Sequence, residues 1–435
     1  MSAHARIAPG APPAAWTVRL PGSKSITNRA LLLAGVARGR SIIREPLVAD
    51  DTLAMVAALG SLGVAVSTVT GVSGGPDWVL DGLGAPPSGP ASVYCGMGAT
   101  VGRFLVPMVA AGAGRFALDA HEQLRRRPLG PVLAALRAQG AVIAGESFPL
   151  VIDASGLDGG ELAVDASVSS QFLSGLLMAA PHARRDTRLR FGKLVSGPYL
   201  DLTRDAMRAF GVETRLENGA VEVRRGGYRG AEFAVEPDVS TASYFLASAA
   251  LTGTTVTLPG LDRRTTAQGD MELVGLLERM GCSVADGAAL SLRGAGRLQG
   301  IEADMERSSD VFMTLACVAV FADGPTTISG IGHARVKESD RIAACAENLR
   351  RLGIEVDEGP DHLRVHPGIP RAGVRLPTYE DHRIAMAFSL IGARVPVLIE
   401  DPAVVGKTCP EFFELWRATG ASVAMAESGA AAGSG

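Results

Sequence analysis

The apolar and polar residues of the chain follow a pattern that recurs six times. Each time, an apolar helical stretch ends in a glycine, and a run of β-type residues begins directly after it. The glycines stand about 70 residues apart, and each is suited to be the left-handed residue that ends a helix. The six joints are Leu59–Gly63, Leu136–Gly140, Met207–Gly211, Leu277–Gly281, Leu349–Gly353 and Trp416–Gly420. The alternative is six unrelated helix–glycine–strand joints, but the regular spacing favours a repeat. We therefore predict an α/β protein of six units, each made of strand, helix, strand, helix and hairpin.

The helices that precede these glycines begin with polar or charged residues, which fit helix starts. If the units pack in the same sense, many helix N-termini lie on one face, which attracts anions. The first three units and the last three suggest two similar halves. Glu236-Pro237-Asp238, about halfway along the chain, is a candidate hinge.

One stretch combines several anion-binding features. Pro21–Arg29 follows the strand-like run Trp16–Leu20 and precedes the apolar helical run Ala30–Ala37. Lys24 and Arg29, with hydroxyl groups between them, stand at a helix start where backbone N–H groups are unpaired. The alternative is a polar helix start with solvated charges. No GxxxxGK[ST] sequence is present, so a nucleotide-binding phosphate loop is not indicated.

Further polar clusters stand at other helix starts and loops, and each alone has a plain alternative as a cap, a turn or a surface charge run. They are Cys95–Arg103, His121–Pro128, Ser167–Phe172, Leu194–Tyr199, Ser308–Asp310, Arg335–Arg341, Glu380–Arg383 and Val405–Thr408. Together they bring cations to helix starts in both halves, which suggests ligands with several negative charges, such as two phosphates and a carboxylate. Asp310 and Glu338 add carboxylates for proton transfer.

Composition narrows the class of protein. The 435 residues, with 47% hydrophobic and 20% charged residues, describe a soluble globular protein of two or three domains. A net charge of −3 does not suggest a nucleic-acid partner, and no apolar run is long enough to span a membrane. No signal-peptide core precedes Trp16, so we expect a cytoplasmic protein. The five cysteines are scattered, so neither a disulfide framework nor a zinc site is expected.

These motifs resemble those of one known family. Pro21–Arg29, Arg127-Pro128, Ser167–Phe172, Arg335–Arg341 and Asp381-His382-Arg383, in this order, look like the 3-phosphoshikimate 1-carboxyvinyltransferases, also called 5-enolpyruvylshikimate-3-phosphate synthases. The resemblance runs from about residue 17 to 417. It implies the two-domain enolpyruvyl transferase fold, an inside-out α/β barrel of six βαβαββ units with the active site in the interdomain cleft.

The resemblance also implies domain boundaries. Residues 1–20 with 237–427 would form one domain and residues 21–236 the other. The ends, 1–14 and 428–435, are rich in Ala, Gly, Ser and Pro, so we expect them to be disordered.

The implied reaction transfers the enolpyruvyl group of phosphoenolpyruvate to the 5-hydroxyl of shikimate 3-phosphate, on the route to chorismate and the aromatic amino acids. It uses no metal and no organic cofactor. The partners are these two small molecules, with no nucleic acid and no membrane, and we expect a monomer.

Site residues follow by position. Shikimate 3-phosphate would be bound by Lys24, Ser25, Arg29, Ser169, Ser170, Gln171, Ser196, Tyr199, Asp310, His333 and Lys337. Phosphoenolpyruvate would be bound by Lys24, Ala99, Arg125, Gln171, Arg341, Arg383 and Lys407. Asp310 would accept the hydroxyl proton, and Glu338 with Lys24 would protonate and deprotonate the methylene carbon.

Three departures from the family pattern stand out. Ala99 replaces the glycine that lies against phosphoenolpyruvate, which predicts reduced sensitivity to glyphosate because of its extra methyl group. Strict alignment puts Gln123 where an arginine is expected, and we assign that role to Arg125. His333 stands where many members have Asn.

Other functions stay open at this point. The departures leave room for a paralogue that acts on a modified shikimate. The enolpyruvyl transferase of UDP-N-acetylglucosamine is the nearest rival, but it would carry Lys-Asn near position 24 and a loop cysteine. A non-catalytic anion-binding protein is the remote alternative, and a nucleic-acid-binding repeat protein is disfavoured by the charge and the few aromatic residues.

Overall fold

The computed structural model describes residues 3–287 and 289–426. The chain divides into two compact units, which we call the continuous unit, Pro21–Glu236, and the split unit, Met1–Leu20 with Pro237–Gly435. This division supports our proposal of two domains with the boundaries given above. The candidate hinge Glu236-Pro237-Asp238 contains the second of the two crossings between units, and its movement stays a prediction.

Three four-stranded sheets form the outside of the continuous unit, and they share one topology. In each, a parallel pair of strands is followed by two strands that pair antiparallel. In spatial order the strands are β14 (Glu232–Ala234), β3 (Arg38–Arg44), β5 (Pro76–Leu83) and β4 (Ala65–Thr70); β6 (Ala91–Tyr94), β7 (Ala113–Asp119), β9 (Leu150–Ser155) and β8 (Val142–Ala144); and β10 (Gly160–Ala163), β11 (Thr187–Arg190), β13 (Ala220–Val223) and β12 (Thr214–Glu217).

The split unit repeats this topology three times. Its sheets are β2 (Ala15–Thr17), β15 (Thr255–Pro259), β17 (Ala289–Arg293) and β16 (Ser283–Ala285); β19 (Glu302–Asp304), β21 (Thr326–Ser329), β23 (Leu363–Val365) and β22 (Val356–Glu358); and β24 (Val374–Leu376), β25 (Val397–Glu400), β1 (His4–Ala8) and β26 (Ser422–Ala426). A short parallel pair, β18 (Leu298–Gln299) and β20 (Ala322–Asp323), is added. The predicted α/β class with six βαβαββ units is thus confirmed.

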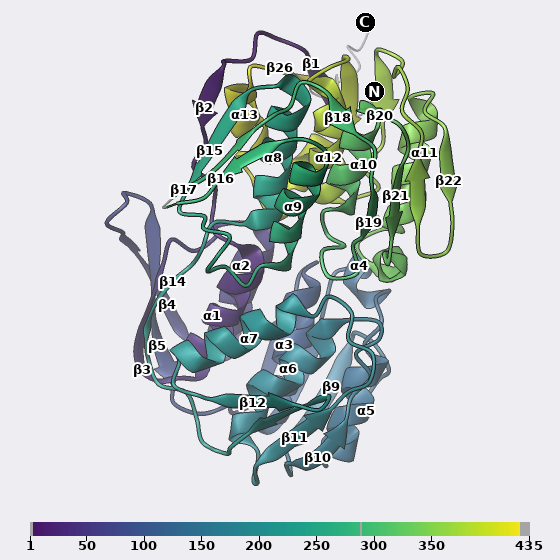
Figure 1. Ribbon diagram of the computed structural model, residues 1–435. Coiled ribbons are helices and arrows are strands. Elements are labelled where there is room, and N and C mark those ends of the chain that lie inside the picture. The colour runs from purple at the N-terminus through teal and green to yellow at the C-terminus, as the bar shows by residue number, and fades with distance from the viewer. Residues whose placement is uncertain (1–2, 288, 427–435) are drawn as a thin grey trace, which may run out of the picture. The chain divides into compact units, whose positions relative to one another are not determined.

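Each unit has its most buried helices inside and its sheets outside. In the continuous unit these helices are α1 (Lys24–Val36), α3 (Ala99–Ala110) and α6 (Ser170–Ala179), and in the split unit they are α8 (Val239–Thr252), α10 (Phe312–Ala319) and α12 (His382–Gly392). Every residue of α3, α10 and α12 is buried, as expected for a helix that is apolar on all sides. Figure 1 shows α3 and α6 side by side within their unit, with β9 to β11 along its outside.

Less buried helices complete the units. The continuous unit has α2 (Asp50–Ser61), α4 (Glu122–Arg125), α5 (Gly130–Ala138) and α7 (Pro198–Ala209), and the split unit has α9 (Glu272–Arg279), α11 (Arg341–Arg351) and α13 (Phe412–Trp416). Short 3₁₀ turns are η1 (Ala180–His182), η2 (Gly269–Met271), η3 (Gly332–Val336), η4 (Pro402–Lys407) and η5 (Arg417–Thr419).

The six repeat glycines adopt the predicted backbone conformation. All have positive φ, from 82° to 112°, which residues with a Cβ rarely adopt. They are Gly63, Gly140, Gly211, Gly281, Gly353 and Gly420. Each turns the chain from an outer helix into the hairpin of its sheet.

The predicted disorder of residues 1–14 is wrong for His4–Ala8. This segment is strand β1, paired on both sides with β25 and β26. Ala5 and Ile7 are fully buried, so the small residues here pack in a sheet instead of marking a loose end. The second predicted tail, 428–435, lies outside the described residues. Within the described part of the chain, every helix is too short or too polar to cross a bilayer.

Candidate functional site

Arg341 lies at the centre of a charged cluster in the split unit. It is the first residue of α11 and its side chain is only 1% exposed. The guanidinium donates to Asp310 at 2.8 Å, to Glu338 at 2.7 Å and to Asp381 at 2.7 Å. These carboxylates raise its pKa despite the burial. One arginine therefore fixes three carboxylates that are far apart in the sequence.

Asp310 contacts two further cations. Lys337 Nζ is 3.3 Å from one carboxylate oxygen, and Arg383 Nη2 is 3.1 Å from the other. Burial favours the protonated acid, but Arg383, Lys337 and Arg341 outweigh it and hold the pKa of Asp310 well below its usual range. As it stands, Asp310 is ionised and a weak base. An anionic ligand that compensates these cations would make Asp310 a stronger proton acceptor.

Glu338 links Arg341 to Lys407. Lys407 Nζ lies 3.3 Å from Glu338 Oε1, and both side chains are less than a tenth exposed. The predicted residues Asp310, Lys337, Glu338, Arg341, Arg383 and Lys407 thus form one connected ion-pair cluster. With Asp381 it holds four cations and three carboxylates, so its net charge favours an anion.

The sequence placed Asp381 in a polar helix start and in the family-like motif Asp381-His382-Arg383, without giving it a role of its own. It is fully buried, caps α12 through Arg383 N at 3.0 Å, and accepts a hydrogen bond from Ser339 at 3.1 Å. Through Arg341 it ties the start of α12 to the start of α11. His333, also predicted, contacts Ser309, with 2.6 Å between Nε2 and Oγ.

In the continuous unit, Lys24 is paired with a carboxylate that the sequence did not single out. Lys24 Nζ lies 3.1 Å from Asp51 Oδ2, and Asp51 is 2% exposed. Lys24 is the first residue of α1, and Asp51 lies in the first turn of α2. A Cβ added at Gly98 would lie 2.9 Å from the Asp51 carboxylate. The space left by Gly98 therefore lets Asp51 hold Lys24.

Arg29 is buried within the continuous unit. Its guanidinium donates to Thr203 at 2.8 Å, to Ser25 O at 2.9 Å and to Tyr199 O at 3.1 Å, with a longer bond to Ser174. Burial lowers its pKa to about 10. The predicted ligands Ser25, Arg29 and Tyr199 are thus joined in one network, in which Arg29 fixes backbone carbonyls near the starts of α1 and α7.

Arg103 joins two more predicted residues and was itself missed. It is 4% exposed and donates to Ser169 Oγ at 3.2 Å and to Gln171 Oε1 at 3.0 Å. Its guanidinium also stacks on Phe172, 4.8 Å from the ring centroid. Ser169 caps α6 by accepting from Gln171 N at 3.3 Å, so the cap interpretation of this serine is confirmed and its role toward a substrate stays a prediction.

Ser196 has an uncommon backbone conformation. Its φ is +51°, which is costly for a residue with a side chain, and it is buried. Ser170, the first residue of α6, and Ala99, the first residue of α3, are buried too. Each of these three predicted residues therefore stands at or just before a helix start.

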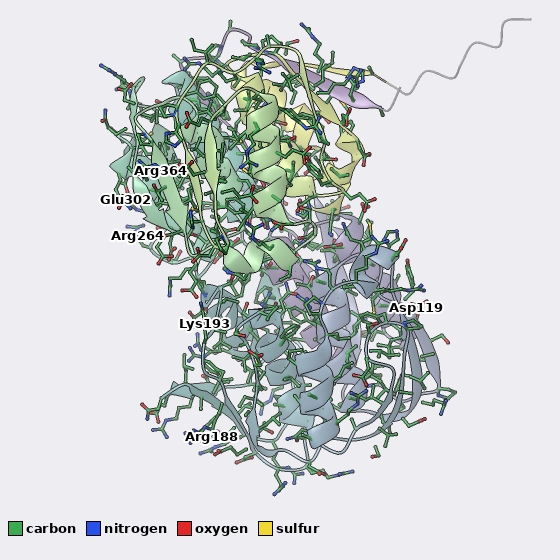
Figure 2. All side chains as sticks on the ribbon, turned by 90° about the vertical axis from the view of Figure 1, so that its right-hand side faces the viewer. Asp119, Arg188, Lys193, Arg264, Glu302 and Arg364 are labelled. Atoms are coloured by element: carbon green, nitrogen blue, oxygen red, sulfur yellow. The ribbon has the colours of Figure 1, made fainter. Side chains whose placement is uncertain are left out.

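Arg125 is engaged by a neighbouring carboxylate. Two bonds, of 3.0 and 2.7 Å, join its guanidinium to Asp119 at the end of β7, and both side chains are more than two fifths exposed. Asp119 is labelled in Figure 2. Gln123 lies in the same short helix, α4, and its backbone N donates to His121 Nδ1 at 3.3 Å. The structure leaves the choice between Gln123 and Arg125 open.

The residues that received no role from the sequence, but which contact predicted site residues, share one property. Asp51, Arg103, Asp119 and Asp381 act on predicted site residues through contacts between distant parts of the sequence or through a helix cap. Asp119, six residues before Arg125, and Asp381, the cap two residues before Arg383, could have been found from local spacing. In the described part of the chain, no group of three or more His, Cys, Asp or Glu side chains could hold a metal ion.

Comparisons with known proteins agree on one family. The model of EPSP synthase (3-phosphoshikimate 1-carboxyvinyltransferase) matches residues 12–416. The chain is 43% identical over 408 residues to a protein named 3-phosphoshikimate 1-carboxyvinyltransferase from Yersinia pseudotuberculosis serotype O:3, with 92% of this chain and 94% of that protein covered. A protein of the same name from Serratia proteamaculans is 42% identical over 408 residues, with the same fractions of the two chains covered.

A solved structure shows the same fold. EPSP synthase from Acinetobacter baumannii superposes with a TM-score of 0.82 at 27% identity, covering 98% of this chain and all of that one. Together, the match over most of the chain, the close relatives and the shared fold show that this chain belongs to the EPSP synthase (3-phosphoshikimate 1-carboxyvinyltransferase) family.

Proposed function

We propose that the chain transfers the enolpyruvyl group of phosphoenolpyruvate to the 5-hydroxyl of shikimate 3-phosphate and releases phosphate. Membership of the family and the names of the relatives support this reaction. The observation that carries it is the cluster around Arg341, in which a buried carboxylate, Asp310, is surrounded by cations. Such a cluster suits a reaction in which an anion binds and a proton moves.

Asp310 acts as the base in this proposal. When the substrate anions compensate Lys337, Arg341 and Arg383, the carboxylate of Asp310 becomes basic enough to accept the proton of the 5-hydroxyl. The hydroxyl oxygen then bonds to C2 of phosphoenolpyruvate while C3 gains a proton. Loss of a proton from C3 and of phosphate from C2 gives the enol ether.

Glu338 and Lys24 move the proton at the methylene carbon C3. Glu338 bonds Arg341 and Lys407, which keep it close to cations that attract phosphoenolpyruvate. Lysine can trade a proton at neutral pH more readily than arginine, which suits Lys24 to this role.

Substrate binding is proposed as follows. Phosphoenolpyruvate is bound by Lys24, Ala99, Arg125, Gln171, Arg341, Arg383 and Lys407. Shikimate 3-phosphate is bound by Lys24, Ser25, Arg29, Ser169, Ser170, Gln171, Ser196, Tyr199, Asp310, His333 and Lys337. For Arg125 this requires that it exchanges Asp119 for the substrate, whereas Arg29, with most donors already bonded, acts mainly by fixing its neighbours. We also propose a cytoplasmic monomer, which size-exclusion chromatography with light scattering tests.

The deciding experiment measures phosphate release from phosphoenolpyruvate with and without shikimate 3-phosphate. Release that depends on both substrates is expected, and Lys24→Met should abolish it. Binding of shikimate 3-phosphate without release would indicate a non-catalytic protein. Release with UDP-N-acetylglucosamine or a modified shikimate, but not with shikimate 3-phosphate, would assign a different acceptor.

A further inference from the structure

The last third of the continuous unit carries an excess of positive charge. Residues 181–230 contain ten arginines and one lysine but only six carboxylates, in a chain whose net charge is −3. None of the charged side chains considered in the next paragraphs belongs to the candidate site. This segment forms α7, β11, β12 and β13.

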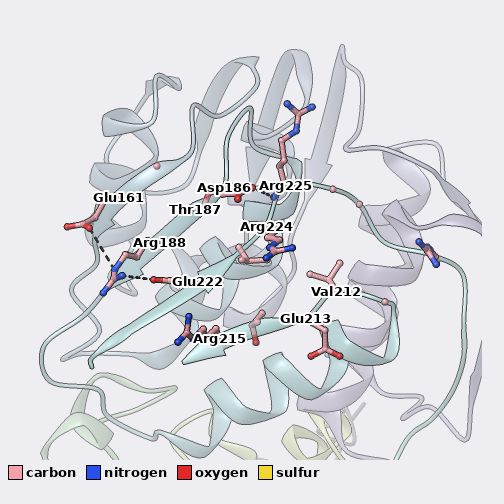
Figure 3. A pocket seen from close by; sticks show the side chains of 17 residues that line it. Glu161, Asp186, Thr187, Arg188, Val212, Glu213, Arg215, Glu222, Arg224 and Arg225 are labelled. Atoms are coloured by element: carbon pink, nitrogen blue, oxygen red, sulfur yellow. Dashed lines mark hydrogen bonds and ion pairs between the residues drawn. The ribbon is translucent and has the colours of Figure 1, made fainter. Parts of the chain in front are cut away.

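A hollow of about 990 Å³ opens on this segment. It lies over one end of the sheet β10–β11–β13–β12 and beside the joint between α7 and β12 (Figure 3). Its cations are Arg188, Arg215, Arg224, Arg225 and Arg229, and its carboxylates are Glu161, Asp186, Glu213 and Glu222. The hollow lies within one unit.

The strands supply cations that are already neutralised. Glu161, Arg188, Glu222 and Arg215 are cross-strand neighbours, so positive and negative side chains alternate across the four strands. Arg188 donates to Glu222 and also lies 3.8 Å from Glu161. Arg215 is paired with Glu217 at 2.6 Å. This row of charges therefore adds little attraction for a ligand.

Arg224 and Arg229 differ from these cations. Both are exposed, and within residues 3–287 and 289–426 neither guanidinium makes a hydrogen bond or an ion pair. In Figure 3, Arg224 points toward the middle of the hollow, and Arg225 points away from it. The stem of Arg229 lies over Gly211, where an added Cβ would be 3.8 Å from Cδ. Its backbone N is fixed by Phe210 O at 3.0 Å.

We propose that this hollow binds a small phosphate dianion, either inorganic phosphate or a phosphate monoester, with Arg224 and Arg229 as its cationic ligands. Guanidinium groups bind phosphate oxygens in pairs and give up little hydration to do so. Asp186 and Glu213 also line the hollow and oppose further negative charge, which favours a single phosphate over a polyanion. The proposal is independent of the proposed reaction.

The phosphate site can be tested by measuring how far phosphate protects arginines from modification by phenylglyoxal. Mass spectrometry identifies the modified positions. At about ten times its Kd, phosphate should slow modification of Arg224 and Arg229 about tenfold. Chloride at equal ionic strength should not slow modification of either arginine. Arg190, on the same sheet but outside the hollow and paired with Glu161 at 3.0 Å, is the matched control and should keep its rate. Glycerol phosphate in place of phosphate distinguishes a monoester site, since it should then protect at lower concentration.

Four outcomes would overturn the proposal. Three of them are no protection at either arginine, equal protection by chloride, and equal protection of Arg190. Protection by a short DNA duplex but not by phosphate would assign the surface to a polymer and also refute it. Because the readout is local to each arginine, phosphate bound elsewhere on the enzyme does not affect the result, and loss of phosphate release from phosphoenolpyruvate leaves the test intact.

Discussion

Gly98→Ala should uncouple Lys24 from Asp51. The φ of Gly98 is −76°, so alanine meets no backbone strain, and only its Cβ matters. That Cβ would lie 2.9 Å from Cγ and Oδ1 of Asp51 and 3.0 Å from Cγ2 of Val101, closer than such atoms pack. Since Asp51 is 2% exposed, it has little room to yield without leaving Lys24, which is 3.1 Å away.

The expected losses of stability and of activity follow from this crowding. Overpacking of this kind costs about 1–3 kcal/mol, which lowers the Tm of a unit of this size by roughly 2–4 °C per kcal/mol. A shift of about 1 Å in a reacting group costs up to about 10²-fold in rate, so we expect kcat/KM to fall about 10- to 100-fold. Phosphate release at varied phosphoenolpyruvate and shikimate 3-phosphate, together with thermal unfolding, measures both.

Gly60→Ala is the matched control. Gly60 lies in α2, the helix that carries Asp51, and an added Cβ there has nothing within 4 Å. It should leave kcat/KM unchanged and stabilise the helix by about 0.5–1 kcal/mol. If Gly98→Ala retained activity within about twofold of the natural protein while its Tm fell, the reasoning that Asp51 positions Lys24 for the reaction would be refuted.

Three further changes test other parts of the molecule. Ala99→Gly should increase sensitivity to glyphosate about tenfold or more by removing a buried methyl group, and an unchanged inhibition curve would contradict the role given to Ala99. Arg341→Lys should destabilise the split unit by about 3–5 kcal/mol and abolish phosphate release, because a lysine cannot reach Asp310, Glu338 and Asp381 together; a Tm equal to that of the natural protein would argue against this. Burial lowers the pKa of His182 to about 4, so the unfolded chain binds the extra proton first, and stability should fall by about 1–3 kcal/mol as the pH drops from 6.5 toward 4. His182→Phe, which keeps a ring against Tyr228, should flatten this part of the pH dependence of the urea midpoint, and an unchanged slope would exclude His182 as its cause.

Features that depend on neighbouring residues could be predicted from the sequence. The positive φ of Gly140 or Gly353 follows from a helix that must end and turn into a strand within a few residues, so a local pattern suffices. The resemblance likewise gave Asp310, Glu338 and Arg341, which the structure joins in one cluster.

Features that depend on partners distant in the sequence could not be predicted from the sequence. Asp51 read as an ordinary helix start, because only the folded chain brings it to Lys24 and opposite Gly98. His4–Ala8 read as a disordered end because its alanines gain their burial from strands almost 400 residues later. Asp119 is only six residues from Arg125, but spacing alone does not give the strength of this pair, on which the choice between Arg125 and Gln123 depends.

The placement of β1 has a consequence for the order in which the chain can fold during synthesis. The continuous unit holds all of its strands between residues 21 and 236, so it can close as soon as that length has left the ribosome. The last sheet of the split unit cannot. Its central strand β1 is among the first residues made, but its neighbours β25 and β26 are among the last. The earliest part of the nascent chain must therefore wait, with its backbone unpaired in that sheet, until translation is nearly complete.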